Sequence, residues 1–129
     1  MEPSQPVIAI VDDDASIRRA LARLLRSVGW KAVVFASAEA FLHAAGQELP
    51  DCLVLDVRLP GMSGVKFLEH GAVTSLSLPV ICITAHDDVQ VRRRAARAGV
   101  VAFLVKPVDE QDLLHAIRSA LGREEIRGE

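Results

Sequence analysis

The chain has 129 residues, 50% of them apolar, and a formal net charge of −2, so it predicts one domain with a single core and excludes a disordered chain. The lack of a basic excess argues against direct contact with nucleic acid, which normally needs a strongly basic surface. No apolar stretch supports a signal peptide or a membrane span, so we expect a cytoplasmic protein that does not contact a membrane.

Short apolar runs and segments of helical periodicity alternate along the chain. The first run, Val7–Val11, precedes a helix with an apolar face over 17–28, and Gly29 follows where a left-handed residue is expected to end that helix. A second strand, Lys31–Phe35, leads to a helix for which Ser37 is a good N-cap. The N-terminal third therefore predicts two strand–helix units.

The same alternation continues toward the C-terminus. Three further strands are expected, over 53–55, 80–83 and 100–105. Three further helices are expected: one begins near Gly64, one spans 88–98, and one begins after Asp109. Strands and helices in this alternation predict a doubly wound α/β domain with a five-stranded parallel sheet and five helices. We expect the domain over 1–121, because 122–129 lacks an apolar period and is typical of a tail or the start of a linker.

The two cysteines, Cys52 and Cys82, fall on expected buried strands. They lack the spacing of metal ligands or of a redox motif, which favours two small core residues in a reducing compartment.

Four of the expected strands lead into residues that can take part in phosphate chemistry. Asp12 and Asp13 follow the first strand, Asp56 the third, Thr84 the fourth and Lys106 the fifth. Open α/β sheets bind ligands at the carboxyl ends of their strands, and parallel strands bring those ends to one edge. We therefore expect three carboxylates, a hydroxyl and an ammonium group to share one crevice.

Such a crevice needs positive charge, because two carboxylates about 4 Å apart repel by about 4 kcal/mol at an effective dielectric of about 20. Lys106 supplies one charge, and a ligand set made only of oxygen favours Mg²⁺ over zinc. Mg²⁺ held by a few carboxylates is commonly completed by a phosphate group. A carboxylate is also a known nucleophile toward phosphorus, so the crevice predicts phosphoryl transfer.

The motifs around these residues resemble those of bacterial response-regulator receiver domains. They read Ile10-Val11-Asp12-Asp13-Asp14, Leu55-Asp56-Val57-Arg58-Leu59-Pro60-Gly61-Met62-Ser63-Gly64, Ile83-Thr84-Ala85 and Val105-Lys106-Pro107, in that order. The resemblance covers 7–121, and Arg58, the segment 37–42 and His86 are similar to the FixJ-type subgroup. It implies a flavodoxin-like or CheY-like fold with strand order 2-1-3-4-5, and a response regulator of a two-component system.

The resemblance also implies a chemical role for the carboxylates. Asp56 would accept a phosphoryl group from a sensor histidine kinase. Mg²⁺ would be held by Asp12, Asp13, Asp56 and the backbone carbonyl of Arg58. The chain would then be a phosphoacceptor that promotes only its own phosphorylation and dephosphorylation, and not an enzyme.

A switch is implied by the same comparison. Thr84 and Lys106 would contact the phosphoryl oxygens, and Phe103 occupies the position of the family's switch aromatic. When Thr84 moves inward, Phe103 would fill the vacated space and change the surface formed by the helix over 88–98, the following strand and the last helix. FixJ-type receivers usually precede a DNA-binding domain, so the implied output is transcription.

The helix over 88–98 carries a concentration of arginines that includes Arg93, Arg94 and Arg97. Two interpretations remain open. The arginines form either a solvated face, or a contact surface for an acidic partner or for a second copy of the chain after phosphorylation.

Two other classes of protein also remain open. The spacing of Asp12 and Asp14 fits the nucleophile and acid of a haloacid-dehalogenase-like phosphatase, although that family needs a longer chain and orders its motifs differently. A flavodoxin-like binder of FMN or a nucleotide is the other alternative, but three aspartates would repel the phosphate of such a ligand.

Overall fold

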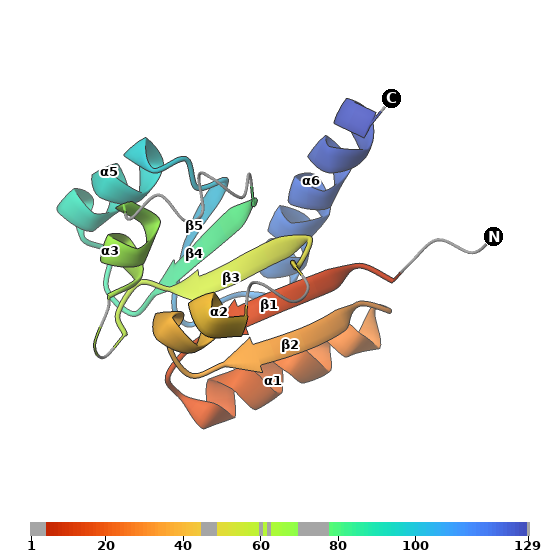
Figure 1. Cartoon of the computed structure of the whole chain (residues 1–129), viewed down its shortest axis with the longest axis horizontal. Coiled ribbons are helices and arrows are strands. Elements are labelled where there is room, and N and C mark those ends of the chain that lie inside the picture. Colours follow the sequence, from red (N-terminus) through yellow and green to blue (C-terminus); the bar gives the residue numbers. More distant parts are fainter. Residues whose placement is uncertain (1–4, 45–48, 60, 62, 70–77, 129) are drawn as a thin grey trace.

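The computed structural model describes residues 5–44, 49–59, 61, 63–69 and 78–128, so Pro60 and Met62 of the quoted motif lie outside it. Strands and helices alternate along the described residues, as predicted (Figure 1). The strands are β1 (Val7–Val11), β2 (Lys31–Phe35), β3 (Cys52–Asp56), β4 (Val80–Thr84) and β5 (Ala102–Val105). The helices are α1 (Ala15–Ser27), α2 (Ala38–Ala44), α3 (Gly64–Glu69), α5 (Val89–Arg97) and α6 (Glu110–Gly128).

The five strands form one parallel sheet in the order β2-β1-β3-β4-β5. The predicted fold class and strand order are therefore confirmed. The chain moves outward from β1 to β2 and then returns across β1 to β3, so the direction of winding reverses between β1 and β3. This reversal is the position at which doubly wound sheets bind ligands.

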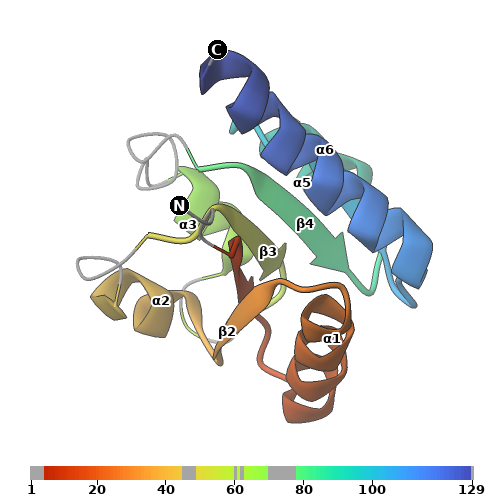
Figure 2. The ribbon, with the colours of Figure 1, turned by 90° about the vertical axis from the view of Figure 1, so that its right-hand side faces the viewer.

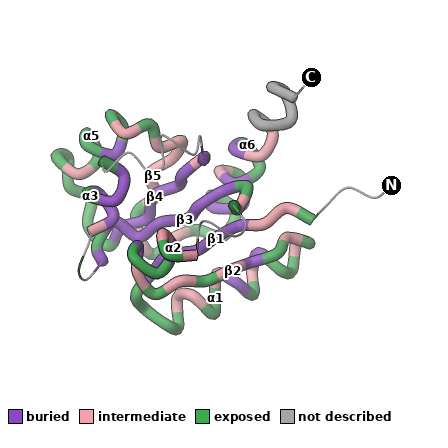
Figure 3. The backbone as a smooth tube through the Cα atoms, in the orientation of Figure 1, coloured by how far each residue is buried: buried purple, intermediate pink, exposed green. Residues whose placement is uncertain are grey.

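The helices cover both faces of the sheet. Alternate residues of each central strand point to opposite faces, so that Leu53 and Leu55 pack toward α2, α3 and α5, while Cys52 and Val54 pack toward α1 and α6. Figure 2 shows α1 and α6 on one side of the sheet and α2 and α3 on the other. β1, β3 and β4 are buried along nearly their whole length, and the edge strands β2 and β5 are more exposed (Figure 3).

Both cysteines belong to this core, as the sequence predicts. Cys52 and Cys82 are fully buried, and burial raises the pKa of each thiol to about 12. At neutral pH both thiols are protonated and pack as small apolar groups.

At the N-termini of most helices, a side-chain oxygen accepts hydrogen bonds from the first backbone amides. Asp14 accepts hydrogen bonds from the first amides of α1, and Asp88 does the same for α5. The predicted cap Ser37 accepts an amide hydrogen bond from α2 at 3.0 Å, and Asp109, directly before α6, accepts one from that helix at 3.0 Å. Such caps stabilise the helix by about 1 kcal/mol each. At the other end of α1, Gly29 has the expected positive φ, 94°.

The predicted boundaries of β3, β4 and α5 differ from the structure by one residue, and those of β5 and α6 differ by more. β5 begins at Ala102 and not at 100, because the N–H of Val100 donates to the carbonyl of Ala95 and so extends the end of α5. α6 continues to Gly128, past the expected boundary near 121. Its last turns carry Glu and Arg, which have good helix propensity even without an apolar face. Among the described residues, no helix is both long and apolar enough to cross a membrane.

Candidate functional site

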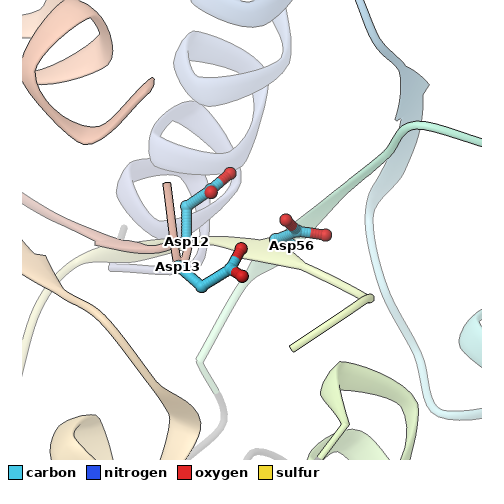
Figure 4. A group of neighbouring side chains, drawn as sticks. All are labelled: Asp12, Asp13 and Asp56. Carbon is cyan, nitrogen blue, oxygen red and sulfur yellow. The ribbon is translucent and has the colours of Figure 1, made fainter. Parts of the chain in front are cut away.

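Three carboxylates meet at the carboxyl edge of the sheet, where the sequence predicted a crevice. Asp12 and Asp13 follow β1, and Asp56 is the last residue of β3, so they flank the reversal in strand order (Figure 4). One oxygen from each carboxylate lies within 4.8 Å of the others. Asp12 and Asp56 are buried and Asp13 is exposed. This spacing lets one cation contact all three side chains.

The ammonium group of Lys106 joins two of these carboxylates. Its Nζ lies 3.1 Å from Oδ2 of Asp12 and 3.1 Å from Oδ2 of Asp56. The N–H of Lys106 donates to the carbonyl of Thr84 at the end of β4, which holds the Lys106 backbone beside the site. Burial opposes the charge on Lys106, but the hydrogen bonds and charges of the two carboxylates outweigh it and raise the pKa of the amine. Lys106 therefore stays cationic at neutral pH.

The carboxylate of Asp56 is held at both oxygens. Oδ1 accepts the N–H of Arg58 at 2.9 Å, and Oδ2 accepts from Lys106. Burial is the largest influence and raises the pKa of Asp56, and the negative charge of Asp12 acts in the same direction. The hydrogen bonds from Arg58 and Lys106 oppose this rise. Asp56 is thus a more basic carboxylate than an exposed aspartate, in a fixed orientation.

The three consecutive aspartates after β1 have different surroundings. Oδ1 of Asp12 accepts the N–H of Asp14 at 2.9 Å, and the carbonyl of Asp12 accepts from Nη1 of Arg18. Asp14 points away to cap α1, and its hydrogen bonds with Ser16 lower the pKa of its carboxyl. No local sequence pattern predicted this contact of Arg18 with the end of β1.

Gly64 lets α3 begin directly against the end of β3. A Cβ atom at Gly64 would lie 2.5 Å from Cα of Val57 and 2.6 Å from the carbonyl oxygen of Asp56. The N–H of Gly64 also donates to the carbonyl of Val57 at 3.0 Å. The sequence predicted the start of a helix here, but not this close approach, which only a residue without a side chain permits.

Thr84 lies at the same edge, but its hydroxyl group is bonded to the loop that follows β4. The hydroxyl donates to the carbonyl of His86 at 3.1 Å and accepts the N–H of His86 at 3.2 Å. Thr84 is almost completely buried. Phe103 sits across from Cys82 on the neighbouring strand and is half-buried, while Arg92 lies over its ring.

The predicted arginine surface is divided in the structure. Arg94 forms two hydrogen bonds with Glu69 of α3, and these raise the pKa of Arg94 and lower the pKa of Glu69. Arg93 and Arg97 are exposed. Arg94 therefore connects two helices, which the sequence did not predict because its partner is 25 positions away.

An open groove of about 500 Å³ borders the site between α1 and the loop that follows β5. Apart from Lys106, the residues that line it are apolar: Ile17, Ala20, Leu21, Ile83, Pro107 and Val108. The Lys106–Pro107 peptide bond at its edge is cis.

Comparison with known proteins connects this geometry to one family. Residues 8–118 match the response regulator receiver domain. Nodulation protein W of Bradyrhizobium diazoefficiens is 41% identical over 126 residues, which are 98% of this chain and 56% of that protein. The transcriptional regulatory protein FixJ of Azorhizobium caulinodans is 36% identical over 126 residues, which are 98% of this chain and 60% of FixJ. The chain thus spans little more than half the length of these relatives.

A solved structure supports the same assignment. The crystal structure of FixJ-N superposes with a TM-score of 0.83 at 36% sequence identity, over 93% of this chain and 96% of that chain. The family match covers both sides of the acidic crevice, from β1 to α6. The chain therefore belongs to the response regulator receiver domain family, with FixJ among its relatives.

Proposed function

We propose that this chain accepts a phosphoryl group on Asp56 from a sensor histidine kinase and responds by changing the surface formed by α5, β5 and α6. The observation that carries the proposal is the buried Asp56 carboxylate, fixed by Arg58 and Lys106, with carboxylate oxygens of Asp12 and Asp13 within 4.8 Å. The chain acts as a phosphoacceptor for signalling and not as an enzyme with an external substrate.

The transfer requires a nucleophile and stabilisation of the phosphoryl oxygens. An oxygen of Asp56 forms a bond to phosphorus while the P–N bond of the donor phosphohistidine breaks, and the bonding electron pair stays on the imidazole nitrogen. No general base is needed, because the carboxylate is already the nucleophile. Lys106 contacts Asp56 before the reaction, so its charge is in place for the arriving phosphoryl group.

The three carboxylates are close enough together to share a divalent cation. Asp12, Asp13, Asp56 and the backbone carbonyl of Arg58 would hold Mg²⁺, which prefers oxygen ligands of this kind. When bound, Mg²⁺ neutralises the repulsion between the carboxylates and part of the charge on the phosphoryl oxygens.

The switch begins at Thr84. A phosphoryl group adds about −1.5 to −2 charge and three strong hydrogen-bond acceptors to the crevice. Two new charge-assisted hydrogen bonds contribute about 3–6 kcal/mol, compared with about 5.5 kcal/mol needed to move an equilibrium from 1:99 to 99:1. Thr84 leaves His86 for the phosphoryl oxygens, and Phe103 turns inward. The altered face of α5, β5 and α6 then binds a second copy of the chain.

The surroundings of the site support contact with a kinase, and the relation to FixJ supports an output. A protein that delivers a phosphoryl group to Asp56 must cover the neighbouring surface, and the apolar groove beside Lys106 offers contact area for it. The family relation to FixJ favours transcription as the output, through a domain beyond the receiver. The receiver would occupy 1–121, with 122–129 as a tail or linker, in a cytoplasmic protein.

The alternative of a haloacid-dehalogenase-like phosphatase is not favoured. The family match over 8–118 is to the response regulator receiver domain and not to that phosphatase family.

Intact-mass measurement with acetyl phosphate tests the proposal. With Mg²⁺ present, the protein should gain roughly 80 Da, corresponding to one phosphoryl group. The Asp56→Asn variant should not gain this mass, and a chelator should suppress the gain in the wild type. An adduct of equal yield on Asp56→Asn, or the lack of any adduct with Mg²⁺, would contradict the assignment of Asp56.

A further inference from the structure

The side chain of Arg92 on α5 contacts both the loop after β4 and the strand β5. Its guanidinium carbon Cζ lies 4.8 Å from the centroid of the Phe103 ring on β5. Its Nε and Nη2 atoms donate to Oδ1 of Asp87 at 3.1 and 2.8 Å, in the loop between β4 and α5. One side chain therefore holds the loop after β4 and the aromatic ring of β5 in a fixed relation.

The loop that forms hydrogen bonds with the side chain of Arg92 also forms hydrogen bonds with the hydroxyl group of Thr84. Asp87 directly follows His86, whose N–H and carbonyl are both bonded to the Thr84 hydroxyl. A continuous series of contacts thus runs from Thr84 through His86, Asp87 and Arg92 to Phe103. Any movement of the Thr84 hydroxyl toward the crevice breaks the first contact of this series.

These contacts are too exposed to stabilise the fold strongly. The side chains of Arg92 and Asp87 are 47% and 55% exposed, and exposed ion pairs contribute little to folding. A cation–π contact at such a site is also weak, but it changes an equilibrium between two positions of Phe103 by about two- to fivefold if only one position makes it.

We propose that Arg92 is a positioning residue that holds Phe103 in its resting position and thereby sets how readily the receiver switches. The inference rests on the proposed function, in which Thr84 moves toward a phosphoryl group on Asp56. Asp87 orients the guanidinium group over the ring, and the movement of Thr84 releases it by shifting the 86–87 backbone. Because Arg92 favours the resting state, its removal favours the phosphorylated state, and linkage requires tighter binding of a phosphoryl analogue.

Titration with beryllofluoride, an analogue of a phosphoryl group on a carboxylate, tests this role in the presence of Mg²⁺. Amide ¹⁵N shifts of Thr84 and Phe103 report binding. We expect Arg92→Ala to lower the half-saturating concentration about two- to fivefold. Asp87→Asn should lower it by a smaller factor, because the guanidinium group then loses its orientation and keeps the ring contact.

Arg118→Ala is the matched control. Arg118 lies over the ring of Trp30, with Cζ 5.9 Å from the centroid. Its replacement therefore removes a contact of the same type away from the crevice. Its half-saturating concentration should equal that of the wild type. If Arg92 had a merely structural role, Arg92→Ala would lower the free energy of unfolding and leave the beryllofluoride affinity unchanged.

The outcomes separate this inference from the proposed function. Wild-type binding with unchanged or weaker binding by Arg92→Ala would overturn the role of Arg92 and leave Asp56 as the acceptor. The lack of beryllofluoride binding and of acetyl phosphate labelling in the wild type would overturn both. An effect of Arg118→Ala equal to that of Arg92→Ala would also overturn the role of Arg92, because the gain would then follow from the loss of any surface arginine.

Discussion

The Nζ atom of Lys106 lies 3.1 Å from Oδ2 of Asp56, although the two residues are 50 positions apart in the chain. The same Nζ contacts Asp12, so one ammonium group compensates two buried carboxylates. We therefore expect the metal-free protein to depend on Lys106 for its stability.

Replacing Lys106 with methionine should lower the free energy of unfolding by roughly 2–4 kcal/mol, because two buried carboxylates lose their positive partner. Urea denaturation at neutral pH, with a chelator present, measures the change. Lys66→Met removes an exposed lysine of α3 and should change the stability by less than about 0.5 kcal/mol. An equal loss in both variants would show that the Lys106 contacts do not stabilise the fold.

The raised pKa of Asp56 predicts a dependence of stability on pH. Since the folded protein holds this proton more tightly than the unfolded chain, Asp56 supports folding fully below its ordinary pKa of 3.8, and this support is lost as the pH rises through the folded-state value. Asp56→Asn removes the titration, so without metal it should be more stable than the wild type at pH 7.

At pH 3 the difference between Asp56→Asn and the wild type should disappear, because the carboxyl group is then protonated in both states. Parallel urea titrations across this pH range follow the difference directly. A wild type that is the more stable protein at pH 7 would mean that the hydrogen bonds of Asp56 outweigh the effect of its burial.

Mg²⁺ should stabilise the folded protein, because its expected ligands come together only after folding. At a concentration about 100 times the dissociation constant, the gain should be about 2.7 kcal/mol, and it should rise with the logarithm of concentration. Thermal unfolding measures it. Asp13→Asn should remove most of the gain, whereas Asp112→Asn, on the exposed first turn of α6, should keep it.

Gly64→Ala should destabilise the protein by about 1–3 kcal/mol, because its Cβ would collide with the backbone at Asp56 and Val57. Gly122→Ala provides the opposite control. A Cβ there meets no atom within 4 Å, and alanine favours the helix by about 0.5–1 kcal/mol. Chemical denaturation should therefore give changes of opposite sign, and a neutral Gly64→Ala would show that α3 can move away from β3.

Much of the fold could be predicted because local and global signals agree. β1 and β2 have the predicted bounds, since each is an apolar run between clear breaks. The crevice could also be predicted, because the parallel arrangement alone brings the residues that follow β1, β3 and β5 to one edge.

The remaining features depend on contacts that no local pattern encodes. Arg94 and Glu69 meet only because α3 and α5 pack side by side. The Thr84 hydroxyl binds its own loop, and the sequence indicated only that it would lie near the crevice. Arg92 lies in the same arginine-rich helix, and no sequence pattern indicated that the ring of Phe103 would be its partner.

The two buried cysteines lie on opposite faces of the sheet, Cys52 toward α1 and α6 and Cys82 toward α2, α3 and α5. Each helical layer thus shields one thiol from alkylating reagents. If one layer detaches before the other during unfolding, the two sulfur atoms become reactive at different times. Alkylation of each thiol therefore reports separately on the opening of one face of the sheet.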